Sequence, residues 1–250
     1  MAITVCPRPL LACWLSGLDN WMRPSGGSMT DIEVLLQGQR LATDSVPRSQ
    51  RLAICFALAM LAMLPAQFYR LGQTEALPWL LADYAGRIAA IAVIVILPAG
   101  RWCLRQRDDL KVGTLEAALW VAAIAMLFRL TPIDSYLMSL FPQLPLGEYP
   151  SPRGVLYAFD ITLGLALVAL HEELVFRKLG SQVFAALGWG TWRTILVTGL
   201  LFGLYHWWRA PAGMIAAAFY GVIAMICYRR TGSLWPVGFA HYLVDYFAFA

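Results

Sequence analysis

From Leu52 onward, the chain alternates apolar runs with short polar loops. A helix needs about 17–25 predominantly apolar residues to cross the hydrocarbon core of a bilayer, and most of these runs have that length. Charged residues make up only 14% of the sequence, whereas a soluble domain carries about 25%. We therefore expect an all-α, polytopic transmembrane helical bundle of about seven spans, at 52–69, 80–100, 114–130, 154–176, 193–209, 212–228 and 233–249.

Residues 1–51 differ from the rest of the chain. They combine several prolines and glycines with five arginines, and their apolar patch at 10–18 is too short to span a membrane. We expect a poorly ordered N-terminal cytoplasmic tail over 1–51 and a transmembrane domain over 52–250. Met1 and Met29 are both candidates for the first residue of the natural chain.

Lysine and arginine predict the orientation, because they are enriched in the cytoplasmic loops of membrane proteins. With the N-terminus in the cytoplasm and seven alternating spans, fourteen of the 19 Lys and Arg residues fall inside. Segment 178–190 fits either an amphipathic helix at the interface or a continuation of the fourth span. The proline-rich loop 131–153 is not a continuous helix, and it is a candidate cap for the outer mouth of the bundle.

Several classes of protein lack their sequence features here. The basic residues are dispersed between apolar runs, so the net charge of +4 predicts no nucleic-acid partner. The five cysteines include no CxxC pair and predict neither a disulfide framework nor a zinc ribbon. The nucleotide patterns GxxxxGKS/T and GxGxxG and the zinc-protease pattern HExxH do not occur. No internal repeat is evident, which disfavours an inverted-repeat transporter.

The densest group of ionisable residues, at His171–Arg177, lies between two apolar runs. One acidic residue at the centre of a membrane helix costs about 2.5–3.5 kcal/mol, so such residues are functional candidates. In a helix, Glu173 and Arg177 are four residues apart on one face and can form an ion pair. Glu172 is rotated by about 100° from Glu173 and is free to point into a cavity.

Two later segments also place ionisable side chains on apolar helices. Phe202 and His206 end one apolar run, and His241 and Asp245 are four residues apart in the last span. Taken alone, each segment has a structural explanation, as an interfacial anchor or an i, i+4 hydrogen bond. The three segments together contain all three histidines of the chain. A shared buried site is therefore the economical way to satisfy these polar groups.

Such a site is suited to hydrolysis, because a carboxylate can activate water and histidines can hold that water or stabilise an oxyanion. No GxSxG pattern is present and no cysteine adjoins a histidine, which favours direct attack by water over an acyl-enzyme. The chain resembles the CPBP family of intramembrane glutamate-type proteases, which includes the type II CAAX prenyl endopeptidases, in three ordered patterns: Glu172-Glu173-x-x-x-Arg177, Phe202-x-x-x-His206 and His241-x-x-x-Asp245.

The resemblance covers roughly residues 115–250. It implies a helical bundle around a cavity that opens toward lipid and one membrane face. By position, it implies that Glu172 activates the water, that His206 holds it, and that His241 and Asp245 occupy the oxyanion-binding place. It also implies that Glu173 and Arg177, with Phe202 of the second pattern, support the site. We expect His171 to lie beside the site or at the interface.

Asp245 departs from the family pattern, which often has asparagine at this place. An ionised aspartate cannot donate a hydrogen bond to an oxyanion. Either Asp245 is protonated, or it orients His241, or it joins Glu172, His206 and His241 as a metal ligand. We rank catalysis without a metal or cofactor first and metal-assisted hydrolysis second.

The depths of Glu172 and His206 in the membrane conflict if each helix ends where its apolar run ends, because consecutive spans are antiparallel. The site closes only if segment 178–190 dips into the membrane or if the fourth helix runs well past Glu172. We expect the second arrangement. A separation of more than about 12 Å between the two side chains would argue against one site.

The resemblance implies an intramembrane endopeptidase, with a membrane-anchored protein or peptide as substrate and the lipid bilayer as its other partner. From compactness and composition alone, we expect a multi-pass protein of a bacterial inner membrane. One alternative is a non-catalytic scaffold or immunity protein of the same fold, in which Glu172→Gln would change nothing. Another is a small proton-coupled transporter, which needs a continuous polar path through the bundle.

Overall fold

The computed structural model describes residues 46–131, 133–141 and 149–250. All regular elements in these ranges are helical, as the sequence predicted. They are α3 (Arg48–Arg70), α4 (Ala76–Ile96), α5 (Pro98–Arg105), α6 (Thr114–Leu130), α7 (Ile133–Leu140), α8 (Gly154–Phe159), η1 (Asp160–Gly164), α9 (Leu165–Glu172), η2 (Glu173–Leu179), α10 (Gly180–Ala186), α11 (Thr191–Tyr205), η3 (Trp207–Arg209), α12 (Ala210–Thr231) and α13 (Leu234–Phe249).

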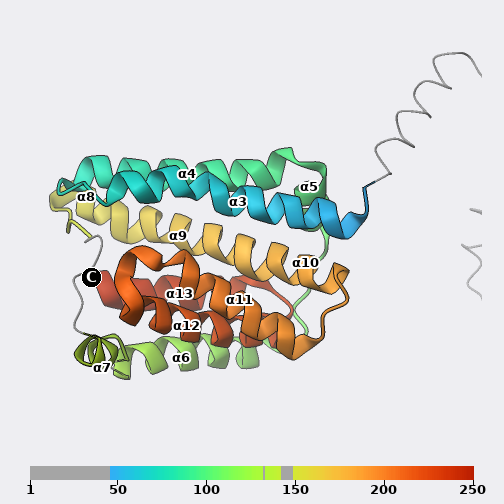
Figure 1. Cartoon of the computed structure of the whole chain (residues 1–250). Coiled ribbons are helices and arrows are strands. Elements are labelled where there is room, and N and C mark those ends of the chain that lie inside the picture. The colour runs from blue at the N-terminus through green and yellow to red at the C-terminus, as the bar shows by residue number, and fades with distance from the viewer. Residues whose placement is uncertain (1–45, 132, 142–148) are drawn as a thin grey trace, which may run out of the picture. The chain divides into compact units, whose positions relative to one another are not determined.

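The helices lie side by side in a bundle (Figure 1). Helices α3 and α4 form an antiparallel hairpin along one side, and the continuous run from α8 to α10 crosses the middle. On the other side of this run, α11 packs against α12, and α13 packs against both α9 and α6. The α8–α10 run therefore has the α3–α4 hairpin on one side and the C-terminal helices on the other.

Four helices are long and apolar enough to cross a membrane: Arg48–Arg70, Ala76–Ile96, Gly154–Ala186 and Trp207–Thr231. Helices α6, α11 and α13 correspond to three further predicted spans, but they have only 17, 15 and 16 residues. The chain is thus a multi-pass membrane protein by helix length and composition, while the number of seven spans stays a prediction.

The fourth predicted span, 154–176, ended too early. The helix continues without a break from Gly154 to Ala186, through α-helical segments and the two π-helical segments η1 and η2. Arg177 and Lys178, which the orientation count assigned to an inner loop, are both buried within it. The expectation that this helix runs well past Glu172 is confirmed, and segment 178–190 is mainly its continuation.

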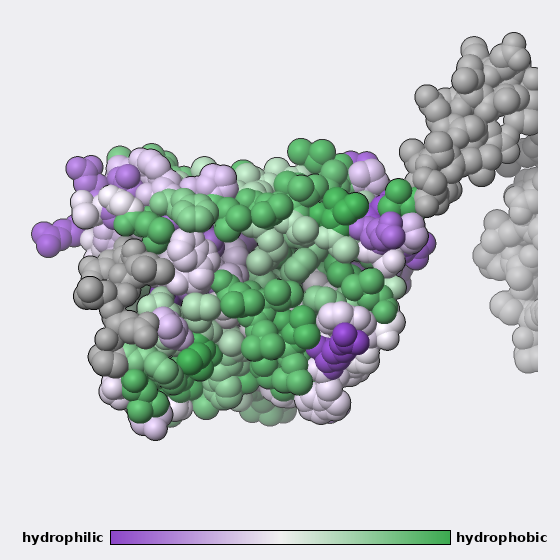
Figure 2. Space-filling view, in the orientation of Figure 1, coloured by the Kyte–Doolittle hydropathy of each residue, from purple (hydrophilic) through white to green (hydrophobic). Residues whose placement is uncertain are grey.

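The outer surface has the character expected of a lipid-facing bundle. Figure 2 shows hydrophobic side chains over the middle of the visible face and hydrophilic ones toward its two ends. Large apolar side chains are exposed on helices throughout the bundle, among them Leu61, Ile88, Leu119, Leu163 and Leu200. In water this exposure would be costly, whereas a bilayer accommodates it.

The predicted N-terminal tail, 1–51, falls mostly outside the described residues. Its last residues are helical, since α3 begins at Arg48 rather than Leu52. The predicted loop 131–153 contains the short helix α7, and Tyr149 beyond it lines the site described below. The cytoplasmic location of the N-terminus stays a prediction.

A tight turn between α11 and α12 carries His206. The two helices approach closely at Gly203, where a Cβ atom would lie only 2.6 Å from the carbonyl oxygen of Met214. The turn then passes through η3 and reaches Ala210, whose φ of 59° is unusual for a residue with a side chain. Backbone strain of this kind is often retained at functional sites.

Candidate active site

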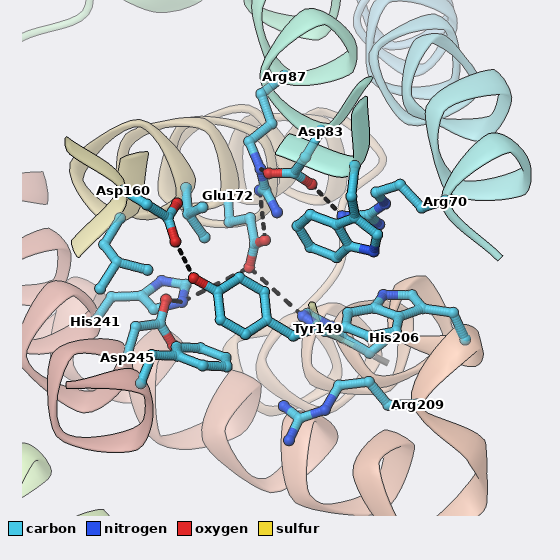
Figure 3. Close-up of a pocket in the computed structure, with 15 residues that line it drawn as sticks. Arg70, Asp83, Arg87, Tyr149, Asp160, Glu172, His206, Arg209, His241 and Asp245 are labelled. Carbon is cyan, nitrogen blue, oxygen red and sulfur yellow. Dashed lines mark hydrogen bonds and ion pairs between the residues drawn. The ribbon is translucent and has the colours of Figure 1, made fainter. Parts of the chain in front are cut away.

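Glu172 lies near the middle of the long helix and is 1% exposed. Its Oε1 accepts a hydrogen bond from Arg87 at 2.7 Å, whereas its Oε2 makes no hydrogen bond to the described residues. Oε2 faces two imidazoles, with Nε2 of His206 at 3.8 Å and Nε2 of His241 at 3.7 Å (Figure 3). These distances are too long for direct hydrogen bonds, and they suit groups bridged by a water molecule.

Glu173, the next residue, uses both oxygens within the protein. Its Oε1 lies 2.7 Å from Nδ1 of His241, and its Oε2 lies 2.9 Å from Nε of Arg177. Arg177 is completely buried, and its guanidinium carbon lies 4.6 Å from the centre of the Phe202 ring, in a cation–π contact. The expected i, i+4 ion pair is therefore present, and Phe202 packs against it.

His241 has carboxylates on both sides of its ring. Nδ1 faces Glu173, while Nε2 lies 3.7 Å from Glu172 and 3.5 Å from Oδ2 of Asp245. Neighbouring carboxylates complement the charge of an imidazolium, in which both ring nitrogens carry hydrogen. In that form, Nδ1–H donates to Glu173 and Nε2–H is directed at the space between Glu172 and Asp245.

His206 is fixed by contacts on both sides of the turn that carries it. Its Nδ1 lies 2.8 Å from the carbonyl oxygen of Phe202 and donates to it, which leaves a lone pair on Nε2 in the neutral ring. The buried side chain of Gln67 donates to the carbonyl oxygen of Tyr205 at 3.1 Å and accepts from Nε1 of Trp207 at 2.8 Å. One amide of α3 thus holds the two residues that flank His206.

Three charged residues of the α3–α4 hairpin extend the site, and sequence reasoning gave none of them a role in it. Arg87 donates to Asp83 at 2.7 Å and to Glu172, and it lies 3.2 Å from Nδ1 of His171. Asp83 also accepts a hydrogen bond from Arg70. All are buried, so Arg70, Asp83, Arg87 and Glu172 form a chain of alternating charge. A buried cation, Arg87, therefore lies directly beside the carboxylate of Glu172.

Asp160 provides another buried carboxylate beside the site. It accepts hydrogen bonds from the hydroxyls of Tyr84, at 2.5 Å, and Tyr149. Burial, together with the hydrogen bond to Asp160, raises the pKa of Tyr149 above its usual value, so its hydroxyl keeps the proton that it donates. Two phenols rather than a cation satisfy this carboxylate. Asp160 lies in the π-helical segment η1, a feature often found near functional sites.

The four residues predicted as catalytic line one cavity of about 80 Å³ (Figure 3). They are Glu172, His206, His241 and Asp245. Arg87 and Asp160 line it too, whereas the predicted supporting residues Glu173, Arg177 and Phe202 do not. Glu173 contacts His241 and Phe202 contacts His206, while Arg177 contacts Glu173 and Phe202. The Glu172–His206 distance of 3.8 Å lies far below the 12 Å that would have argued against one site. His171 lies buried beside the site, as expected.

A metal ion was the second-ranked alternative for this site. Within the part of the chain that the structure describes, no group of three His, Cys, Asp or Glu side chains has a geometry that could hold one.

A sequence signal for the additional residues exists, but it is weak. Asp83 and Arg87 are four residues apart in an apolar helix, and Gln67 and Arg70 are three apart in the preceding one, so each pair shares a face. Polar residues on one face of a spanning helix indicate a buried partner, but the spacing does not name that partner.

Comparison with known proteins supports the resemblance that the motifs carry. Residues 154–247 match a family model described as type II CAAX prenyl endopeptidase Rce1-like. The match includes all three motifs and excludes α3 and α4. No match was found among curated proteins or among solved structures.

Proposed function

We propose, from the Rce1-like family to which residues 154–247 belong, that the chain is an intramembrane endopeptidase in which Glu172 activates a water molecule. The family match suggests a protease of the membrane. The catalytic role of each residue is our inference from the geometry of the cavity.

One observation carries this proposal. Oε2 of Glu172 is buried, makes no hydrogen bond with the described part of the protein, and lies within 4 Å of two imidazole nitrogens. A buried carboxylate oxygen without a hydrogen bond destabilises the fold, so its presence calls for a bound water molecule or a functional role. A water molecule between Oε2 and the two Nε2 atoms would satisfy all three groups at once.

The same arrangement suits hydrolysis of a peptide bond. In the proposed reaction, Nε2 of His206 accepts a hydrogen bond from the water, and Oε2 of Glu172 removes its other proton as the oxygen attacks the carbonyl carbon. The proton then passes from Glu172 to the amide nitrogen as the C–N bond breaks. The products are a carboxylic acid and an amine, and the carboxylate of Glu172 is restored.

Negative charge that develops on the carbonyl oxygen requires a donor. Nε2–H of His241 provides one, because Glu173 holds the other ring nitrogen at 2.7 Å. Asp245 lies 3.5 Å from the same Nε2. A protonated Asp245 would add a second donor, whereas an ionised Asp245 would orient His241.

Arg87 supports the role of Glu172 from the opposite side. It fixes Oε1, so only Oε2 is available to water, and its charge compensates that of the buried carboxylate. We propose a bacterial inner membrane as the location, with the N-terminus in the cytoplasm, and a membrane-anchored protein or peptide as the substrate.

The test compares the terminal peptides of the membrane proteome in cells that express wild type or Glu172→Gln at equal levels. A precursor that accumulates only with the variant, together with loss of its cleaved product, is expected. Identical termini would refute proteolysis and return attention to a scaffold of the same fold. Proton flux through proteoliposomes that depends on Glu172, without cleavage, would instead favour a transporter.

A further inference from the structure

A pocket of about 330 Å³ lies at the end of the bundle where α5 and α10 end (Figure 1). Its lining comes from the linker between α5 and α6, from α10, and from the C-terminal end of α12. None of the lining residues belongs to the cavity that holds Glu172. The pocket is therefore separate from the candidate active site.

Positive charge predominates in this pocket. Arg107, Lys111 and Arg229 line it, against the single carboxylate of Asp109. The neighbouring Asp108 is already engaged in an ion pair with the long helix, at 2.8 Å. Within the described part of the chain, no ion pair involves Arg107 or Lys111. Cations that converge on one pocket repel each other, so this arrangement favours an anion among them.

The linker that carries two of these cations is fixed on the end of α12. The backbone N–H of Lys111 donates to the carbonyl oxygen of Thr231 at 2.7 Å. Gly232 has a φ of 73°, and a Cβ atom there would lie 2.8 Å from the carbonyl oxygen of Asp109. A residue without a side chain thus lets the linker lie this close, and the pocket is formed before any ligand binds.

Capping of α12 does not account for the cations. Lysine and arginine side chains often bind the last carbonyl oxygens of a helix. Here the carbonyl oxygen of Thr231 accepts from the backbone of Lys111, and that of Tyr228 accepts from the backbone N–H of Gly232 at 2.8 Å. Because backbone groups cap these carbonyls, the side chains of Arg107 and Lys111 are not needed for that purpose.

The depth of the pocket matches the phosphate groups of a bilayer. The long helix that ends with α10 and the helix that ends with α12 are both long enough to span a membrane. Ala185 and Arg229, in the last turns of these helices, line the pocket. Trp192 and Trp235 begin the next two helices and are exposed, and tryptophan is enriched where a bilayer meets water.

We propose that this pocket binds the phosphate group of an anionic phospholipid headgroup. Arginine and lysine form charge-assisted hydrogen bonds with phosphate oxygens, and Gln182 adds a neutral amide donor to the same lining. Basic pockets between spanning helices bind such headgroups, and the orientation proposed above places this end in the cytoplasmic leaflet, which carries anionic lipids. The site does not depend on the proposed peptidase activity.

Arg105 and Arg107 provide a matched pair for a test. Both are exposed and lie two residues apart at the end of α5, but only Arg107 lines the pocket. Arg107→Gln and Lys111→Gln each remove one charge from the pocket, whereas Arg105→Gln removes the same charge beside it. All three side chains are exposed, so we expect the variants to fold, and thermal unfolding in lipid-free detergent checks this.

The measurement is native mass spectrometry of the full chain in detergent, titrated with phosphatidylglycerol, which gives the dissociation constant of the first bound lipid. Diacylglycerol with the same acyl chains lacks the phosphate, and inorganic phosphate lacks the chains. We expect wild type to bind phosphatidylglycerol at least about tenfold more tightly than diacylglycerol, since only the former accepts charge-assisted hydrogen bonds. Inorganic phosphate should weaken this binding more than sodium chloride of the same ionic strength does.

The variants then locate the binding. We expect Arg107→Gln and Lys111→Gln each to lose at least about fivefold in affinity for phosphatidylglycerol, and Arg105→Gln to stay within about twofold of wild type. An equal loss in all three variants would mean that the lipid binds the diffuse charge of this end, which would overturn the site. Equal affinity for phosphatidylglycerol and diacylglycerol would overturn it as well.

A soluble phosphate compound is the other source of the same chemistry. If inorganic phosphate raises the unfolding temperature of wild type but not of Arg107→Gln or Lys111→Gln, while phosphatidylglycerol does not bind, the lipid headgroup is refuted as the ligand.

Discussion

The candidate site draws on two regions of the chain that contribute in different ways. The family-matched region contributes Glu172, His206 and His241, whose polar atoms surround the place proposed for the water. The α3–α4 hairpin lies outside the match; its Arg87 contacts Oε1 of Glu172, and its Gln67 contacts the two residues that flank His206. The comparison teaches that the groups assigned to chemistry and the groups that orient them are encoded far apart in the sequence.

The largest expected effect comes from a change in the family-matched region. Glu172→Gln keeps the volume of the side chain and an acceptor for Arg87 but removes the base. General base catalysis contributes about 10²–10⁴-fold, so we expect kcat to fall by that factor. The measurement is turnover of a precursor identified by terminal-peptide profiling. Insertion and thermal stability close to wild type provide the control, and retained turnover would remove Glu172 from the chemistry.

A change in the α3–α4 hairpin should act differently: we expect Arg87→Gln to lower stability as well as turnover. Removing the cation leaves the buried carboxylate of Glu172 without its partner, at a cost of about 3–5 kcal/mol. In the double variant with Glu172→Gln, part of that cost should disappear, because no charge is left unpaired. Thermal unfolding in detergent measures both, and purely additive effects would contradict the pairing.

Lys178 offers a matched control for this cycle. It pairs with Asp108 at 2.8 Å in another ionic contact of the same long helix, and it does not line the cavity that holds Glu172. Lys178→Gln should lower stability while leaving kcat unchanged. A similar loss of turnover in both variants would mean that Arg87 acts only through folding, and the distinction between the two regions would fail.

The sequence predicted the contacts within the family-matched region better than those of the α3–α4 hairpin, for a physical reason. The pairing of Glu173 with Arg177 follows from helical periodicity, and the meeting of three motifs follows from the cost of buried charge. The contact of Arg87 with Glu172 joins residues 85 positions apart, and no local rule specifies such a partner.

The helix boundary at 176 failed for a related reason. Arg177 and Lys178 have the composition of a loop, and only their tertiary partners reveal that they are buried. Glu173 contacts Arg177, while Asp108 and the carbonyl oxygen of Gln106 contact Lys178. Two consecutive charged residues thus led to a predicted helix end at a point where the helix continues.

A smaller effect is expected for Gln67→Met, which keeps the volume but removes both hydrogen bonds to the turn. The carbonyl oxygen of Tyr205 and Nε1 of Trp207 then lose their partner, at about 1–3 kcal/mol for each buried group that stays unpaired. Because His206 lies between them, we expect kcat to fall by about tenfold with KM nearly unchanged. Loss in KM alone would show that the turn serves substrate binding.

The smallest effect concerns Asp245, which either donates a hydrogen bond to the oxyanion or orients His241. If a protonated Asp245 donates to the oxyanion, asparagine can donate through its amide, and Asp245→Asn should stay within about threefold of wild type. If an ionised Asp245 orients His241 instead, the lost charge should lower kcat by about tenfold or more, as it does for other carboxylate–histidine pairs. Because Nε2 of His241 already lies between Asp245 and Glu172, at 3.5 Å and 3.7 Å, and Glu173 fixes the other nitrogen, we expect the first outcome. Turnover of Asp245→Asn, with Asp245→Ala as the variant that can neither donate nor accept, separates the two.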